Sequence, residues 1–394
     1  MGGGETMALV EQIRHEIRSI TTGKYPDFIW SRRKRLDWDY VPVFAFHSIE
    51  PAEFERKIAH LQANGYQTVF LDDVVRHVRG DHSLPDRSVA ITIDDGRLST
   101  WSVAFPILRK YGMCATAFVI PGYVDSAERF RPTLDDGPAS AIWRSAANDR
   151  ASVMSWLEVS ELHRSGVIAI ESHSMLHRMV YTDDGCVDFL NPELEEPIFK
   201  IPMDPSRRKG WSREELLTRL GTPLFSRAQI LETESAYVPN PDVVAACRQW
   251  VSRRGGEDFF RQPRKRWRRA LQDVVERAGG EGSYVDTEAA QRWEISAAKR
   301  QLEERLPGKT VKHFCYPRAA GSDRANRLLR DTGHESCVWG IRPAASSNRP
   351  GCDPFQIGRL KHDFVQCLPG RGRKHFGQIY AEKARRRFRG ETGF

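Results

Sequence analysis

Two segments of the chain carry side chains that can bind a metal ion and transfer a proton. Two adjacent carboxylates, Asp94 and Asp95, come directly after a β-branched apolar run. Two histidines four positions apart, His173 and His177, follow a second apolar run. Two imidazoles and one carboxylate can hold a divalent metal, and the remaining carboxylate can act as a base. This combination indicates metal-assisted hydrolysis.

The ligand types favour zinc and keep other metals open. Two imidazoles with one carboxylate are typical of catalytic zinc sites, which leave room for water and substrate. The same ligands also accept cobalt, nickel, iron or manganese. Each motif alone has a simpler interpretation. The run 94–96, Asp-Asp-Gly, is also a plain turn sequence, and a lone His-x-x-x-His is often a structural pair.

Strands and helices must alternate along the chain to position these residues. Predicted strands lie at 41–46, 66–70, 88–93, 114–120, 167–170, 311–316 and 335–339, and predicted helices at 51–63, 71–78, 101–111, 156–164, 287–306 and 322–331. Such alternation indicates a parallel sheet, either open or rolled into a barrel. Because functional groups collect beyond the carboxyl ends of parallel strands, Asp94, His173 and the pair Pro317-Arg318 are expected to face one pocket. His47 ends the first strand and fits either the pocket or a structural role.

The predicted fold is divided into four parts. Residues 1–40 are expected to form an N-terminal extension and residues 41–365 the α/β domain. The strand–helix pattern breaks at 181–285, which is interpreted as a partly helical insertion with a helical run at 243–251. Residues 366–394 form a basic C-terminal tail.

Composition is that of an ordinary globular protein, with 40% hydrophobic and 28% charged residues among 394. No apolar stretch reaches the roughly 18 residues of a spanning helix, and the N-terminal sequence lacks the pattern of a secretory signal, so a cytoplasmic location is expected. Seven scattered cysteines without a C-x-x-C pair favour reduced thiols. The net charge of +8 is concentrated at 261–269 and 371–389. A solvated basic surface is the preferred interpretation over a binding site for anions.

The motifs resemble those of the polysaccharide deacetylase family, the NodB-homology carbohydrate esterases of the family 4 type. Residues 91–96, I-T-I-D-D-G, are similar to the family's first motif, T-F-D-D-G, and residues 173–177 to its second, H-[ST]-x-x-x-H. Residues 314–317 resemble the third motif in its F-x-Y-P form, and residues 360–362 resemble the closing L-x-H. The resemblance spans about 41–365 without the insertion.

This resemblance implies a distorted (β/α) barrel and the metal-dependent hydrolysis of an N-acetyl group from an amino sugar. By motif position, Asp94 would be the general base. Asp95, His173 and His177 would be the metal ligands, with Zn²⁺ as the first expectation. His362 would protonate the leaving amine.

Departures from the family pattern affect substrate binding. The third motif usually carries Arg where Cys315 stands, and Tyr-Gly where Arg318 and Ala319 stand. Arg359, beside the closing motif, is expected to supply the missing positive charge. The backbone N–H near Arg318 is expected to help stabilise an oxyanion. Together with Tyr316, these two arginines form the predicted substrate-binding group.

The expected substrate is an N-acetylated amino sugar in a biosynthetic intermediate, such as a nucleotide- or lipid-linked saccharide whose phosphates the basic clusters could contact. Nucleic acid is not an expected partner. Two alternatives stay open at this point. One is a hydrolase of cyclic amides or imides on the same fold. The other is a non-catalytic protein that binds saccharides or anions, with a basic tail that contacts nucleic acid or membrane.

Overall fold

Eight parallel strands form the main sheet of the protein. The computed structural model describes residues 25–388 except 30–36, 38, 149–152 and 194–200, so the predictions made for most of 1–40 and for 389–394 lie outside the described residues. The order of the paired strands is β11-β10-β5-β4-β3-β1-β12, and β2 also pairs with β3. The strands are β1 Val43–Phe46, β2 Gln67–Val69, β3 Ser88–Ile93, β4 Ala115–Val119, β5 Ile168–Ser172, β10 His313–Cys315, β11 Ser336–Val338 and β12 Leu360–Lys361.

Backbone hydrogen bonds join the two ends of this sheet. Val338 of β11 forms a parallel bridge with Ile357, and the N–H of Arg359 donates to the carbonyl of Gly340 at 2.9 Å. The chain then continues into β12, which pairs with β1. The sheet therefore closes into a distorted barrel, and the fold class predicted from the sequence is confirmed.

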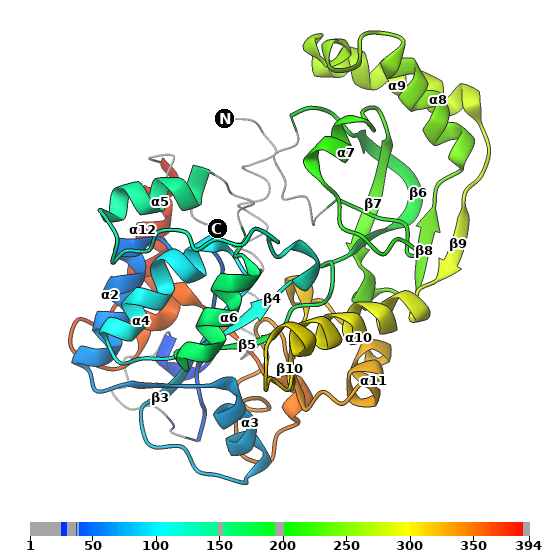
Figure 1. The fold of residues 1–394 in the computed structure, drawn as a ribbon. Helices are drawn as coiled ribbons and strands as arrows, with labels where there is room; N and C mark the ends of the chain where they lie inside the picture. The colour runs from blue at the N-terminus through cyan, green and yellow to red at the C-terminus, as the bar shows by residue number, and fades with distance from the viewer. Residues whose placement is uncertain (1–24, 30–36, 38, 149–152, 194–200, 389–394) are drawn as a thin grey trace.

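Helices pack around the barrel (Figure 1). They are α2 Pro51–Ala63, α3 Leu71–Arg79, α4 Phe105–Lys110, α5 Ala139–Asn148, α6 Trp156–Ser165, α10 Glu288–Arg305, α11 Asp323–Asp331 and α12 Phe376–Phe388. Local signals explain where they begin. In α6, the Ser155 side chain accepts from the N–H of Glu158, whose side chain accepts from the N–H of Ser155, forming a capping box. Gly166, in the left-handed conformation, ends the helix.

Side chains on each barrel strand alternate between the barrel interior and the layer under the helices. On β1, Val43 belongs to the interior cluster, whereas Phe44 and Phe46 pack under the helices. On β10, Cys315 lies inside and Phe314 outside. This alternation decides which residues beyond each strand can reach a pocket at the end of the barrel.

The interruption after β5 contains a second sheet beside the barrel (Figure 1). This sheet is antiparallel with the order β7-β6-β8-β9. Its elements and accompanying helices are β6 Met179–Phe189, α7 Arg213–Leu217, β7 Pro223–Gln229, β8 Ser235–Val238, α8 Pro241–Ser252, α9 Arg264–Ala278 and β9 Ser283–Asp286. The sequence predicted helical content here, but it did not predict the sheet. The four domain boundaries stay predictions.

The two basic clusters lie on different elements. Residues 264–269 are on α9, at the end of the insertion away from the barrel (Figure 1), where Arg264 and Arg268 pair with Asp188. The second cluster includes α12, in which Ile379 is buried in the main core. Much of the predicted tail is thus a helix packed on the domain. None of the helices in the described ranges is both long and apolar enough to cross a membrane.

Candidate active site

The carboxyl ends of β3 and β5 bring the two polar motifs together. Asp94 and Asp95 follow the last residue of β3, and His173 follows the last residue of β5. Asp95, His173 and His177 are buried, and each offers one ligand atom within 4.8 Å of the others. The three predicted metal ligands therefore converge, as the positions of the strand ends required.

Left-handed backbone occurs at three non-glycine positions of this site. The φ angle is 71° at Asp95, 64° at Ser174 and 50° at His177. Each such residue costs on the order of 1–3 kcal/mol and persists where the surrounding structure holds it, as often happens at functional sites. Gly96, also left-handed at 68°, completes a tight turn. The turn interpretation of Asp-Asp-Gly and the functional interpretation therefore describe the same geometry.

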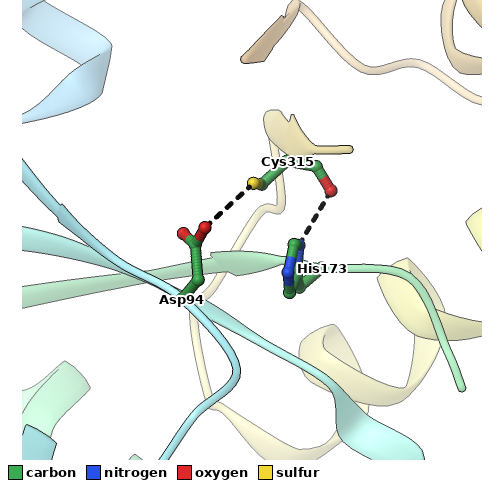
Figure 2. Close-up of side chains that lie close together, drawn as sticks. All are labelled: Asp94, His173 and Cys315. Carbon is green, nitrogen blue, oxygen red and sulfur yellow. Dashed lines mark hydrogen bonds between the residues drawn. The ribbon is translucent and has the colours of Figure 1, made fainter. Parts of the chain in front are cut away.

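The donor atoms fit a divalent metal. Arg97 donates to Oδ2 of Asp95 from Nε at 3.0 Å and from Nη2 at 2.8 Å, while Oδ1 lies 3.5 Å from Nε2 of His173. His173 donates from Nδ1 to the backbone oxygen of Cys315 at 2.9 Å (Figure 2), so its Nε2 is the nitrogen that faces Asp95. One carboxylate oxygen and two imidazoles in a buried site match a catalytic zinc site. The sequence did not predict Arg97, although its place two residues after Asp95 was a signal.

Asp94 lies beside these ligands and is held by Arg359. Nη1 of Arg359 donates to Oδ1 of Asp94 at 2.7 Å, and Nε of Arg359 donates to the Trp339 carbonyl at 3.1 Å. Burial raises the pKa of Asp94, but the charges of Arg359 and His173 lower it by more, so the net shift is downward. Asp94 is therefore ionised near neutral pH, as a general base must be. Arg359, predicted to supply a positive charge, does so beside Asp94.

His47 is a second titratable side chain beside Asp94. Its Nε2 lies 3.6 Å from Oδ2 of Asp94, and 44% of its side chain is accessible to solvent. Burial of the ring lowers the pKa of His47, and the carboxylates of Asp94 and Asp95 oppose this shift. Of the two roles open for His47 in the sequence, the structure supports the pocket. The odd-numbered side chains of β1 face inward, and this periodicity was the available signal.

His362, the predicted acid, is not brought to this site. It lies on the outer side of the barrel, where its ring stacks on Phe46 at 5.0 Å and its Nδ1 is 2.6 Å from Nζ of Lys57. Burial first, and the Lys57 charge second, lower the pKa of His362 to about 4. The ring is therefore neutral near pH 7, and its contacts are with Lys57 and Phe46 instead of the metal ligands. His362 follows β12 directly and lies on the same side as Leu360, two residues before it, so the structure does not bring it to the metal ligands, and its role as acid stays a prediction.

The other two predicted substrate contacts are Tyr316 and Arg318, which differ in burial. Tyr316 is fully buried, donates its hydroxyl to Oδ1 of Asn326 at 2.8 Å and packs against Trp339. Tyr316 directly follows β10 and packs in the same outer cluster as Phe314, so the structure does not bring it to the metal ligands, and a contact with substrate stays a prediction. Arg318 is exposed and has a φ of 53°. A contribution of the backbone near Arg318 to an oxyanion stays a prediction.

Cys315 stands where the third motif of the family usually carries arginine, and its side chain points into the barrel from β10. Its thiol is fully buried and lies 3.7 Å from Oδ2 of Asp94 (Figure 2). Burial raises the pKa of the Cys315 thiol, so the group is a neutral neighbour of the base and no activated nucleophile.

Comparison with known proteins confirms the resemblance to the polysaccharide deacetylases. Residues 81–195, which contain both motifs, match the family model described as polysaccharide deacetylase. The Bacillus subtilis (strain 168) protein YxkH, named for the same family, is 31% identical over 124 residues, or 29% of this chain and 44% of that protein. The poly-β-1,6-N-acetyl-D-glucosamine N-deacetylase of Escherichia coli (strain K12) is 28% identical over 129 residues, or 33% of this chain and 18% of that enzyme.

The chain thus spans less than half the length of these two curated relatives. Among solved structures, the BpsB deacetylase domain from Bordetella bronchiseptica aligns with 82% of this chain and 96% of that domain, at a TM-score of 0.49 and 16% identity. The resemblance to the family rests on the sequence matches.

Proposed function

We propose that the protein is a metal-dependent N-deacetylase that removes the acetyl group from an amino sugar within a saccharide. One observation carries this proposal: the donor atoms of Asp95, His173 and His177 meet within 4.8 Å, with the ionised Asp94 beside them. The sequence match to a family of polysaccharide deacetylases supports the same reaction.

Each residue has a distinct role in this reaction. A Zn²⁺ ion held by the three ligands would polarise the acetyl carbonyl and lower the pKa of a bound water. Arg359 holds Oδ1 of Asp94, which directs Oδ2 to accept the proton of the attacking water. His47, with Nε2 3.6 Å from that same oxygen, is positioned to protonate the leaving amine. Arg97 keeps Asp95 oriented for the metal.

The direct test is acetate release from N-acetylglucosamine oligomers. A β-1,6-linked oligomer is the first choice, because the E. coli relative is named for that polymer. We expect activity that a chelator abolishes and that Zn²⁺ or Co²⁺ restores. Ring opening of a cyclic amide without acetate release would instead establish the second hydrolase hypothesis. Saccharide binding that turns over nothing and survives loss of His173 and His177 would contradict catalysis altogether.

Two histidines are candidates for the acid, His47 from the structure and His362 from the L-x-H motif, and substitution of each distinguishes them. His47→Gln is expected to lower kcat by about 10²-fold, at the low end for general acids because the His47 side chain is partly accessible and water can take its place. His362→Gln is expected to leave kcat within about twofold, because the ring contacts Lys57 and Phe46 instead of the site. Steady-state kinetics on one substrate measures both. The reverse pattern would restore the assignment made from the L-x-H motif.

The finer substrate and the location stay predictions. A nucleotide- or lipid-linked intermediate and a cytoplasmic location were expected from the sequence. The cluster on α9 lies at the far end of the insertion (Figure 1), so these charges do not support a phosphate-binding role at the metal site. Comparing kcat/KM for free, nucleotide-linked and polymeric saccharides would identify the preferred substrate class.

A further inference from the structure

The two metal-binding histidines are supported by different parts of the chain. The Nδ1 atom of His173 donates to the backbone oxygen of Cys315 in β10, so its partner belongs to the barrel. The Nδ1 atom of His177 lies 3.4 Å from Nε2 of Gln229, the last residue of β7 in the insertion. The insertion therefore contacts a predicted metal ligand directly.

The register of the inserted sheet brings Gln229 to this position. β6 begins at Met179, two residues after His177, and Met179 pairs with Gln229 in the antiparallel β6–β7 ladder. On the next residue, the N–H of Ile230 donates to the carbonyl of Arg178 at 3.0 Å. Backbone pairing on both sides thus fixes Gln229 against the loop that carries His177.

The carboxamide of Gln229 has one end in contact and one end without a partner. Gln229 is only 1% exposed, and its Nε2 also lies 2.8 Å from Sδ of Met179. Its Oε1 is buried and accepts no hydrogen bond from the described residues. A buried acceptor without a donor costs about 1–3 kcal/mol. A donor that reaches Oε1 of Gln229 would therefore stabilise the side chain.

A metal-bound imidazole supplies such a donor. A neutral histidine that binds a metal through Nε2 carries its proton on Nδ1 and needs an acceptor there. A half-turn of the Gln229 carboxamide exchanges Nε2 and Oε1, because the two ends have nearly the same shape. That half-turn places the acceptor against Nδ1 of His177, so the oxygen gains a donor, and it moves Nε2 to the position that Oε1 held.

We infer that Gln229 is a positioning residue of the metal centre. By accepting a hydrogen bond from Nδ1 of His177, it selects the tautomer that binds through Nε2 and fixes the orientation of the ring. The inference rests on the proposed metal-dependent function and extends it to the insertion. Gln229 lies outside the segment 81–195 that matches the family, so this chain recruits a support for its metal ligand from its own inserted sheet.

The test is the affinity for Zn²⁺, measured without substrate by competition with a chromophoric chelator. Gln229→Leu removes the acceptor at similar volume and is expected to raise the dissociation constant by about 10–100-fold. Gln229→Glu keeps an acceptor and is expected to bind Zn²⁺ nearly as tightly as the parent protein. The absorption spectrum of the Co²⁺ form should change in the leucine variant and not in the glutamate variant. Gln229→Met gives the same measurement should the leucine variant not fold.

Gln291→Leu is the matched control. Gln291 is also fully buried beside the insertion, and its Nε2 donates to the carbonyls of Ile230 and Thr233 at 2.7 and 2.8 Å. We expect it to lower stability and to leave Zn²⁺ affinity unchanged. Equal loss of affinity in Gln291→Leu, or a glutamate variant as weak as the leucine variant, would overturn the inference. A protein that binds Zn²⁺ normally but releases no acetate would contradict only the proposed function.

Discussion

Asp94→Asn is expected to lower kcat for deacetylation by about 10²–10⁴-fold while the protein still binds Zn²⁺. The amide keeps the shape of the side chain but cannot take a proton from the attacking water. Metal binding should persist because the three ligand atoms belong to Asp95, His173 and His177. Acetate release measured beside a Zn²⁺ titration of the same preparation checks both parts of this expectation.

Asp95→Asn is the matched control, since it makes the same chemical change one residue along the chain. Here the metal affinity should fall together with the activity, because Asp95 supplies a ligand oxygen and its other oxygen is held by Arg97. Asp94→Asn also leaves the buried Arg359 without its carboxylate, so urea unfolding of the variant must accompany the kinetics. A folded Asp94→Asn variant with normal kcat would show that another group is the base.

The barrel and the convergence of the three predicted ligands could be predicted from the sequence because both depend on local patterns. The strand 88–93 was predicted with its observed bounds, and the helix 51–63 likewise. The convergence of Asp94, Asp95 and His173 then follows from the rule that carboxyl ends of parallel strands share one edge of a sheet. These parts required no knowledge of long-range contacts beyond that rule.

The residues around the ligands were predicted less well because motif resemblance does not specify which face a residue occupies. Tyr316 and His362 stand at positions similar to family motifs, yet each comes directly after a strand, two residues beyond an apolar residue of the outer core. Alternation along a strand would have excluded both from the pocket and favoured His47 and Arg359. The alternation of side chains along a strand therefore indicates which residues face the barrel interior, and the motifs alone do not.

The inserted sheet could not be predicted because its strands lack a regular pattern. β6 contains the turn-like run Asp183–Gly185, and its pairing with β7 shifts register between Tyr181 and Cys186 and again before Asp188. Such irregularities break the alternation on which a strand prediction depends. β9 is exposed at all four of its residues, so it has no buried face to detect. Only pairing with distant segments specifies these strands.

The loop that carries the two histidines is fixed by a charge pair that is fully buried. Nε of Arg178 donates to Oε1 of Glu294 in α10 at 2.8 Å, and both side chains are inaccessible to solvent. The other Glu294 oxygen accepts from the N–H of Leu176 at 2.8 Å. Arg178 also donates to the carbonyls of Asp204 and Arg207 in the insertion. One pair thus joins the histidine loop, the barrel helix α10 and the insertion.

Arg178→Met is therefore expected to lower the free energy of unfolding by about 3–5 kcal/mol, because it leaves Glu294 charged and buried without its partner. The double variant Arg178→Met/Glu294→Gln should recover much of this loss, since no unpaired charge remains and the amide still accepts from Leu176. Arg109→Met is the control, because Arg109 pairs with Asp135 at the surface and such pairs contribute about 0–1 kcal/mol. Urea unfolding followed by tryptophan fluorescence measures all three. A cost for Arg178→Met no larger than that of the control would mean that the pair does not hold the histidine loop in place, and the left-handed residues at Ser174 and His177 would then need another support.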